Sequence, residues 1–176
     1  MKINRIIMST FFLIAGMTNA DAGTFYSFEG GVGFGAMNKG NAICSKFGME
    51  IRFDNFVNKV RVVNIDKTLD NKPSFGQYLE AGLLPGIMLG KNDKMSLHLH
   101  AGLSFIYFVE WRDNYNQNII SEPKPHTYRT IGLPIEIEFM VIPLDNVGIG
   151  FSLMGNINGP NSFVGCAISL HYGKLR

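Results

Sequence analysis

Apolar and polar side chains alternate with a period of two along most of the chain beyond residue 25. In the clearest segment, residues 129–141, apolar side chains occupy every second position from Ile131 to Val141, while Glu136 and Glu138 fall in the opposite set. A helix would scatter these carboxylates among the apolar side chains, whereas a strand separates the two sets onto two faces. The pattern therefore predicts a β-strand with one apolar and one polar face.

Seven further segments show the same alternation, and several reach the ~10 residues that a tilted transmembrane strand requires. Eight strands are an even number, as expected of a single-chain outer-membrane barrel. The other predicted strands are residues 26–35, 47–53, 59–62, 78–89, 95–107, 147–157 and 164–172.

The predicted connections alternate between short and long. Short ones fall at 54–55, 91–94 and 144–146, and longer polar ones at 38–45, 66–74, 112–126 and 158–162. Membrane barrels have tight periplasmic turns at one end and longer external loops at the other. The order of the connections predicts an antiparallel up-and-down barrel with four external loops.

The apolar face carries large and aromatic side chains, whereas the opposite face carries glycine, serine and most of the charges. A soluble barrel that binds an apolar ligand would show the reverse, so the apolar face is predicted to meet outer-membrane lipid or a partner sheet. Buried charges must be paired, so the interior is predicted to hold ion pairs, with glycines making room and no open pore. The predicted interior charge network is Glu29, Glu50, Arg52, Lys59, Arg61, Glu80, Glu136 and Glu138, accompanied by the interior histidines His98, His100 and His171.

The first 22 residues have the features of a cleavable signal peptide. Lys2 and Arg5 precede an apolar run from Ile6 to Met17, which is too short to span a membrane as a helix, and small residues follow. Cleavage after Ala20 and cleavage after Ala22 both fit, and residues 23–176 then form one barrel domain. The net charge of +2 includes the positive charges of Lys2 and Arg5 in this segment. Nothing in the chain favours a nucleic-acid partner.

Four segments resemble the small eight-stranded outer-membrane proteins of the OmpX and OmpA-transmembrane type, within the outer membrane protein beta-barrel domain family. The resemblance implies a cell-surface protein of the Gram-negative outer membrane that the barrel-assembly machinery inserts. Members usually end on an aromatic residue that this machinery reads, whereas here Tyr172 is followed by a four-residue tail. The segments are Gly30–Gly35, Ile131–Glu136, Gly148–Gly155 and Phe163–Tyr172.

For each group of residues that could catalyse a reaction or bind a metal, the pattern favours a purely structural role. Glu136 and Glu138 could form an acid/base pair, but membership of the ion-pair network is favoured. The three histidines could bind zinc, but no carboxylate or cysteine stands at motif spacing, so no metal and no cofactor is predicted. Cys44 and Cys166 are favoured as unpaired thiols, although a disulfide stays open.

The sequence therefore predicts a non-enzymatic integral outer-membrane barrel with a structural or adhesive role, or one in recognition by surface loops. The loop 112–126 is the best candidate for a binding surface, and its external partner is not specified. Two alternatives stay open: a lipid-modifying barrel enzyme, which needs a Ser/His or His/acid pair near one rim, and a soluble secreted barrel around a small apolar ligand.

Overall fold

A computed structural model describes residues 25–37, 40–66, 76–92, 94–112, 124–159 and 161–175, and nearly all of them lie in antiparallel strands. The predicted signal peptide, residues 1–22, lies outside the described residues. Within the described part, no helix is long and apolar enough to cross a membrane.

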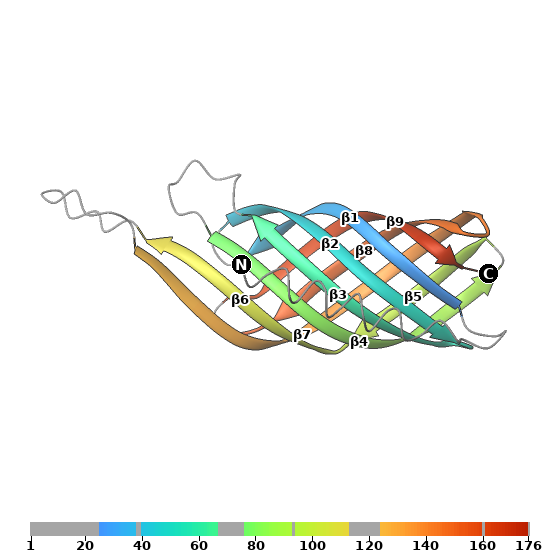
Figure 1. The fold of residues 1–176 in the computed structure, drawn as a ribbon, viewed down its shortest axis with the longest axis horizontal. Helices are drawn as coiled ribbons and strands as arrows, with labels where there is room; N and C mark the ends of the chain where they lie inside the picture. Colours follow the sequence, from blue (N-terminus) through green and yellow to red (C-terminus); the bar gives the residue numbers. More distant parts are fainter. Residues whose placement is uncertain are drawn as a thin grey trace, which may run out of the picture.

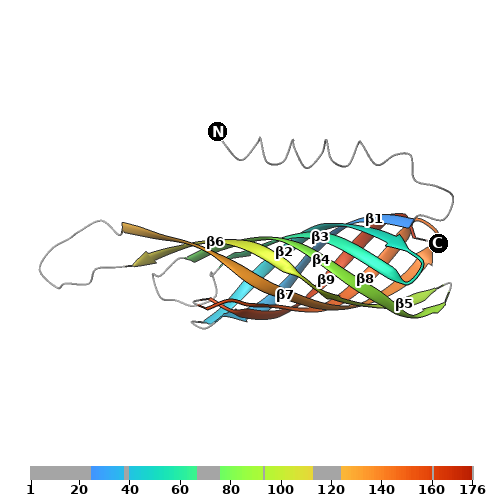
Figure 2. The same ribbon diagram turned by 90° about the horizontal axis from the view of Figure 1, so that it is seen from below.

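The strands form one closed sheet, because β9 pairs with both β8 and β1. Figures 1 and 2 show the resulting elongated barrel, with strands inclined to its long axis. The strands are β1 (Phe25–Met37), β2 (Gly40–Phe53), β3 (Phe56–Asp66), β4 (Gly76–Asn92), β5 (Met95–Ala101), β6 (Leu103–Arg112), β7 (Lys124–Leu144), β8 (Val147–Ile157) and β9 (Phe163–Lys174).

β5 and β6 together make one strand of the barrel, interrupted at Gly102. Both lie between β4 and β7. The Gly102 N–H donates a hydrogen bond to the Pro134 carbonyl at 3.0 Å, and a Cβ at Gly102 would overlap the Leu83 carbonyl oxygen. The predicted eight-stranded antiparallel barrel is therefore confirmed, with one local break that only glycine fits.

Side chains alternate strictly between the lumen and the outer surface. Ile135, Ile137 and Phe151 are 44%, 45% and 55% exposed, whereas Glu136 and Arg61 are fully buried. Large apolar side chains therefore cover the outside and charges fill the inside. This is the reverse of a soluble barrel with an apolar cavity.

Three layers fill the lumen. The charged layer lies between two apolar clusters, one toward the loop end and a smaller one toward the turn end, so the predicted ionic interior describes only the middle layer. The loop-end cluster consists of Ala42, Cys44, Val63, Ile65, Tyr78, Ile106, Phe108, Met154, Phe163 and Ala167, and the turn-end cluster of Met140, Ile142 and Leu175.

The predicted long loop 38–45 is wrong. β2 begins at Gly40, and Asn41 pairs with Ala36 of β1, so the first connection is short and the strict alternation of short and long connections fails there. Ala42 and Cys44 are buried while Asn41 is exposed. Outward side chains at this end need not be apolar, and their polarity made a strand resemble a loop.

The predicted loop 112–126 is also too long. β6 continues to Arg112, which pairs with Lys124 at the start of β7, so residues 112 and 124–126 belong to strands. Residues 113–123 lie outside the described residues. The short turn at 54–55 is confirmed, and the turn predicted at 144–146 lies at 145–146 because Leu144 still belongs to β7. The connection 158–162 between β8 and β9 is also confirmed. Asp54 adopts a φ of 53° in the first turn, a left-handed conformation that aspartate tolerates better than most residues.

We expect Ile137→Lys to lower the free energy of unfolding by about 2–4 kcal/mol, because it places a charge on the lipid-facing surface near mid-height of the barrel. Leu144→Lys is the matched control at the end of β7, where the cost falls to about 0–1 kcal/mol. Urea unfolding of the protein in lipid vesicles measures both. Equal losses at the two positions would contradict a bilayer around the apolar surface.

Candidate functional site

The charged layer is assembled from strands on opposite walls of the lumen. Lys46 comes from β2, Lys59 and Arg61 from β3, and Glu136 and Glu138 from β7. The two residues from β3 are two positions apart, as are the two from β7, so each pair points to the same side of its strand. All five are fully buried.

Glu136 is the centre of this network. Its Oε1 accepts hydrogen bonds from Lys46 Nζ at 2.7 Å and Lys59 Nζ at 3.0 Å, and its Oε2 accepts one from Arg61 Nη1 at 2.8 Å. Glu138 shares both lysines, with Lys59 Nζ at 2.8 Å and Lys46 Nζ at 3.1 Å. The contacts tie β2 and β3 to β7 across the lumen.

A third carboxylate, that of Glu80, extends the network toward the loop end. Arg61 Nη2 donates to Glu80 Oε1 at 2.6 Å. Asn156 Nδ2 donates to Glu80 Oε2 and to Ser104 Oγ, both at 2.7 Å, and the Tyr78 hydroxyl donates to Glu80 Oε2 at 3.2 Å. The polar layer thus continues up to the apolar cluster at that end.

Glycines leave the space that the long side chains occupy. A Cβ at Gly150 would lie 2.6 Å from both Glu138 Oε1 and His171 Nε2, and one at Gly48 would lie 2.5 Å from Glu29 Oε1. Glu29 in turn lies 3.1 Å from Lys59 Nζ. The lumen therefore has room for the long charged side chains only because glycine occupies these two positions.

The predicted interior histidines separate into two groups. His98 Nδ1 and His100 Nε2 lie 3.3 Å and 3.8 Å from Glu50 Oε2. His171 Nε2 lies 3.1 Å from Glu138 Oε1. Arg52, the remaining predicted member, lies toward the turn end, where its Nη2 donates to the Leu175 carbonyl at 2.6 Å.

Ser169, His171 and Glu138 meet within hydrogen-bond distance. Ser169 Oγ lies 3.1 Å from Glu138 Oε1 and 3.1 Å from His171 Nε2. The same ring nitrogen contacts both partners, whereas a serine–histidine–acid relay uses one ring nitrogen for the nucleophile and the other for the acid. All three side chains are also sealed in the lumen, so this contact lacks both the geometry and the access of a nucleophilic site.

Sequence reasoning missed Lys46, Ser152, Asn156 and Ser169 as members of the network. Lys46 directly follows the predicted loop 38–45, although it shares parity with Glu50 and Arg52 on β2. Lys46 Nζ also donates to Ser152 Oγ at 3.0 Å. If the predicted strand 47–53 is extended toward its N-terminus, the alternation of faces places Lys46 inside the lumen.

The two cysteines lie on opposite faces of the sheet. Cys44 is buried in the loop-end apolar cluster and Cys166 is exposed on the outer surface, and both are free thiols. In the register, Cys44 faces Gly33 and Cys166 faces Phe34, so β1 stands between them.

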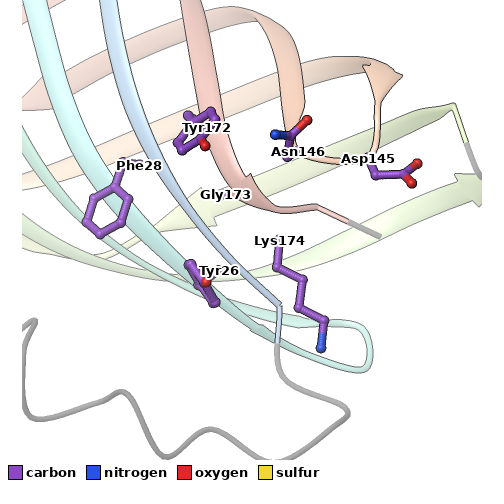
Figure 3. A pocket seen from close by; sticks show the side chains of 7 residues that line it. All are labelled: Tyr26, Phe28, Asp145, Asn146, Tyr172, Gly173 and Lys174. Carbon is purple, nitrogen blue, oxygen red and sulfur yellow. The ribbon is translucent and has the colours of Figure 1, made fainter.

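An open groove of about 600 Å³ lies on the outer surface near the turn end. Figure 3 shows the rings of Tyr26, Phe28 and Tyr172 beside Lys174 and the turn residue Asp145. Lys174 Nζ also lies 5.5 Å from the centre of the Phe25 ring. Amphipathic rings next to a cation suit the headgroup level of a bilayer.

The β6–β7 hairpin extends beyond the other strands, as Figures 1 and 2 show. β7 pairs with β6 from Lys124 onward but with β8 only from Leu133 onward. In the described part of the chain, residues 124–132 of β7 therefore have a neighbouring strand on one side alone. Arg129 lies 6.0 Å from the Tyr107 ring centre across the hairpin.

The register shows which main-chain groups face the open edge. The Pro134 carbonyl points to Gly102, on the β5–β6 side, and the pairing with β6 continues without a shift. Because main-chain groups alternate sides along a strand, the N–H and C=O groups of Thr127 and Arg129 point away from β6. Pro125, which has no N–H, falls in the same outward set, where an edge strand tolerates it.

The comparisons with known proteins bear on the fold. No sequence family and no curated protein matches the chain. Among solved structures it is similar to Neisserial surface protein A (NspA), with TM-score 0.66, 10% identity and coverage of 86% of this chain and 97% of that one. It is also similar to a major outer membrane protein from Thermus thermophilus, with TM-score 0.67, 9% identity and coverage of 85% and 98%.

An enzyme shares the same architecture. The outer membrane enzyme PagL matches with TM-score 0.52 at 12% identity, covering 83% of this chain and 98% of that one. The attachment invasion locus protein Ail of Yersinia pestis matches with TM-score 0.61 at 9% identity, covering 86% and 98%. The chain therefore has the fold of small bacterial outer-membrane barrels, a fold that carries more than one function.

We expect Glu136→Gln to lower the free energy of unfolding by about 3–5 kcal/mol, because it leaves three buried cations with too little negative charge. Asp54→Asn, at an exposed turn, makes the same chemical change and should cost no more than about 0.5 kcal/mol. Urea unfolding in detergent micelles compares the two. A midpoint for Glu136→Gln equal to that of the control would contradict the role of the network.

Proposed function

We propose that this protein is an integral outer-membrane protein, neither a pore nor an enzyme, that uses the protruding β6–β7 hairpin for adhesion or recognition. The observation that carries the proposal is the edge of β7 at residues 124–132, which has a neighbouring strand on one side alone within the described residues.

The outer surface supports the membrane location. Exposed aliphatic and aromatic side chains surround the barrel, with Ile131 70% and Val32 67% exposed, and water would not favour so large an apolar surface on a monomer. Tyr172, 62% exposed on β9, is our candidate for the aromatic residue that the barrel-assembly machinery reads.

The filled lumen supports a structural scaffold without a pore. One apolar cluster lies at each end of the charged layer. Within that layer, the side chains of Lys46, Lys59 and Arg61 reach across the lumen to Glu136. An eight-stranded barrel has room for side chains and little else.

The open edge supports recognition by strand addition. An exposed edge offers unpaired main-chain N–H and C=O groups to an extended segment of a partner, and main-chain hydrogen bonds then supply the affinity. The rigid barrel holds this edge away from the membrane. The alternative of a lipid-modifying enzyme rests on fold likeness alone, since the contact of Ser169 with His171 is sealed inside.

We expect planar bilayers containing the purified protein to show no stable, large conductance steps, because no continuous channel passes the three filled layers. Single-channel recording is the measurement, with a known porin as the positive control. Reproducible large steps would contradict the proposal of a closed scaffold.

We expect the double variant Thr127→Pro, Arg129→Pro to reduce adhesion of cells displaying the full chain to cultured host cells. The two prolines remove outward N–H groups and leave the hydrogen bonds to β6 in place. A main-chain hydrogen bond contributes about 1 kcal/mol, so losing two predicts a decrease in affinity of roughly tenfold or more.

The matched control is Thr127→Val, Arg129→Gln, which changes the same side chains but keeps both N–H groups. Heat-modifiable gel migration checks that every variant is folded. Equal adhesion of the proline variant and the control, or no adhesion above that of cells lacking the protein, would count against recognition through this edge.

A further inference from the structure

The lumen contains a cluster of two imidazoles and two carboxylates apart from the central lysine contacts. His98 and His100 lie two positions apart on β5, and Glu138 faces His98 in the register of β5 with β7. Glu50 reaches them from β2, on the other side of the lumen. One ligand atom from each of the four lies within 4.8 Å of the others, and all four residues are buried.

We propose that Glu50, His98, His100 and Glu138 form a binding site for one divalent transition-metal ion, with the ligand chemistry of Zn²⁺. Imidazole nitrogen and carboxylate oxygen together suit zinc and its neighbours, whereas Mg²⁺ and Ca²⁺ prefer oxygen alone. The site would join β2 to β5 and β7 through one ion.

The distances are close to those of a loaded site. Zinc–ligand bonds of about 2.0–2.2 Å place the ligand atoms of a tetrahedron roughly 3.3–3.6 Å apart. Glu50 Oε2 lies 3.3 Å from His98 Nδ1 and 3.8 Å from His100 Nε2. The side chains of Glu50, His98 and His100 therefore need to rotate only slightly to bind one ion.

The imidazole of His100 is an independent sign of a missing partner. The residue is 2% exposed, and neither of its ring nitrogens has a hydrogen-bond partner among the described residues. A buried polar group without a partner is rare and calls for an explanation such as a bound ion. A metal on Nε2 supplies that partner.

The charge of the lumen points the same way. Among the described residues, five buried carboxylates (Glu29, Glu50, Glu80, Glu136 and Glu138) face four buried cations (Lys46, Arg52, Lys59 and Arg61). With neutral histidines, one negative charge is left without a counterpart. Such an excess favours binding of a cation.

The lysine nearest to the site does not exclude an ion. Lys59 Nζ contacts Glu138 Oε2 at 2.8 Å, but a carboxylate oxygen has two lone pairs and serves two partners. The Oε2 of Glu50 faces the two imidazoles, while its Oε1 lies 3.6 Å from Arg52 Nε. Glu50, His98 and His100 therefore bind the ion first, and Glu138 completes the tetrahedron.

The test is to fold the untagged mature chain into detergent in metal-free buffer, add Co²⁺, and remove the excess by gel filtration. We expect one tightly held Co²⁺ per chain with the visible absorption bands of a tetrahedral site, which Zn²⁺ abolishes by displacement. Zn²⁺ should also slow unfolding in urea at least tenfold. No retained metal, or an octahedral Co²⁺ spectrum, would overturn the proposal.

His98→Gln and His100→Gln each remove one ligand, and we expect each to weaken Zn²⁺ binding by about 100-fold or more, beyond what loss of an outer-shell partner usually costs. The matched control is His126→Gln, an exposed histidine on β7 that is not one of the four ligands and should keep the metal. Metal retained equally by all three variants would overturn the assignment. If a ligand variant does not fold, X-ray absorption of the Zn²⁺-loaded wild-type protein decides, since fewer than two imidazole ligands contradicts the site.

Discussion

The rest of the structure depends on the contacts of Lys46, Lys59 and Arg61 with Glu136 across the lumen. An isolated charge in such a place costs several kcal/mol, and a buried pair is tolerable only when the geometry is good and the remaining donors and acceptors are satisfied. β2, β3 and β7 each carry charged residues at alternate positions. These charges can be paired and fully hydrogen-bonded only if the charged faces of the three strands surround one enclosed space. A slip of one residue in any of the three would turn its charges toward the apolar exterior. The network therefore does more to specify register and closure than to add net stability.

The same network explains why function is expected outside the lumen. Within the described residues, side chains fill the lumen in three layers, which supports our proposal of a closed and rigid scaffold. The β6–β7 hairpin, in contrast, continues beyond Ile157, where β8 ends, and within the described part of the chain residues 124–132 of β7 have one neighbouring strand. Rigid scaffolds that hold variable or exposed segments are a common way to build recognition surfaces.

The fold could be read from the sequence because one physical rule acts along the whole chain: lipid outside and charge inside give a period of two. From Ile131 to Val141 every second residue is apolar, and Glu136 and Glu138 fall in the opposite set. The rule no longer holds near the rims of the barrel, because outward side chains there contact water and can be polar. Asn41 therefore resembles a loop residue, although it lies in a strand. Contacts across the lumen were beyond sequence reasoning for another reason. Whether Glu50 meets His98 or Arg61 meets Glu80 depends on strand tilt and on rotamers, and neither leaves a local pattern. The alternation along each strand predicts which side chains point into the lumen, but it does not predict which of them contact one another.

The excess of one buried carboxylate admits two physical solutions, and the histidines distinguish between them. If His98 were an imidazolium, its Nδ1, 3.3 Å from Glu50 Oε2, would form an ion pair and restore neutrality. That solution does nothing for His100, whose two ring nitrogens would still lack partners among the described residues. A metal ion uses both imidazoles and Glu50 together, and because its ligands come from β2 and β5 it would act where the lysine contacts do not reach. A divalent ion more than offsets the single negative charge and leaves the lumen with one net positive charge, and it also accounts for the unpartnered ring and for the convergence of strands that are not neighbours. Protonation of His98 restores neutrality and accounts for neither of these two features.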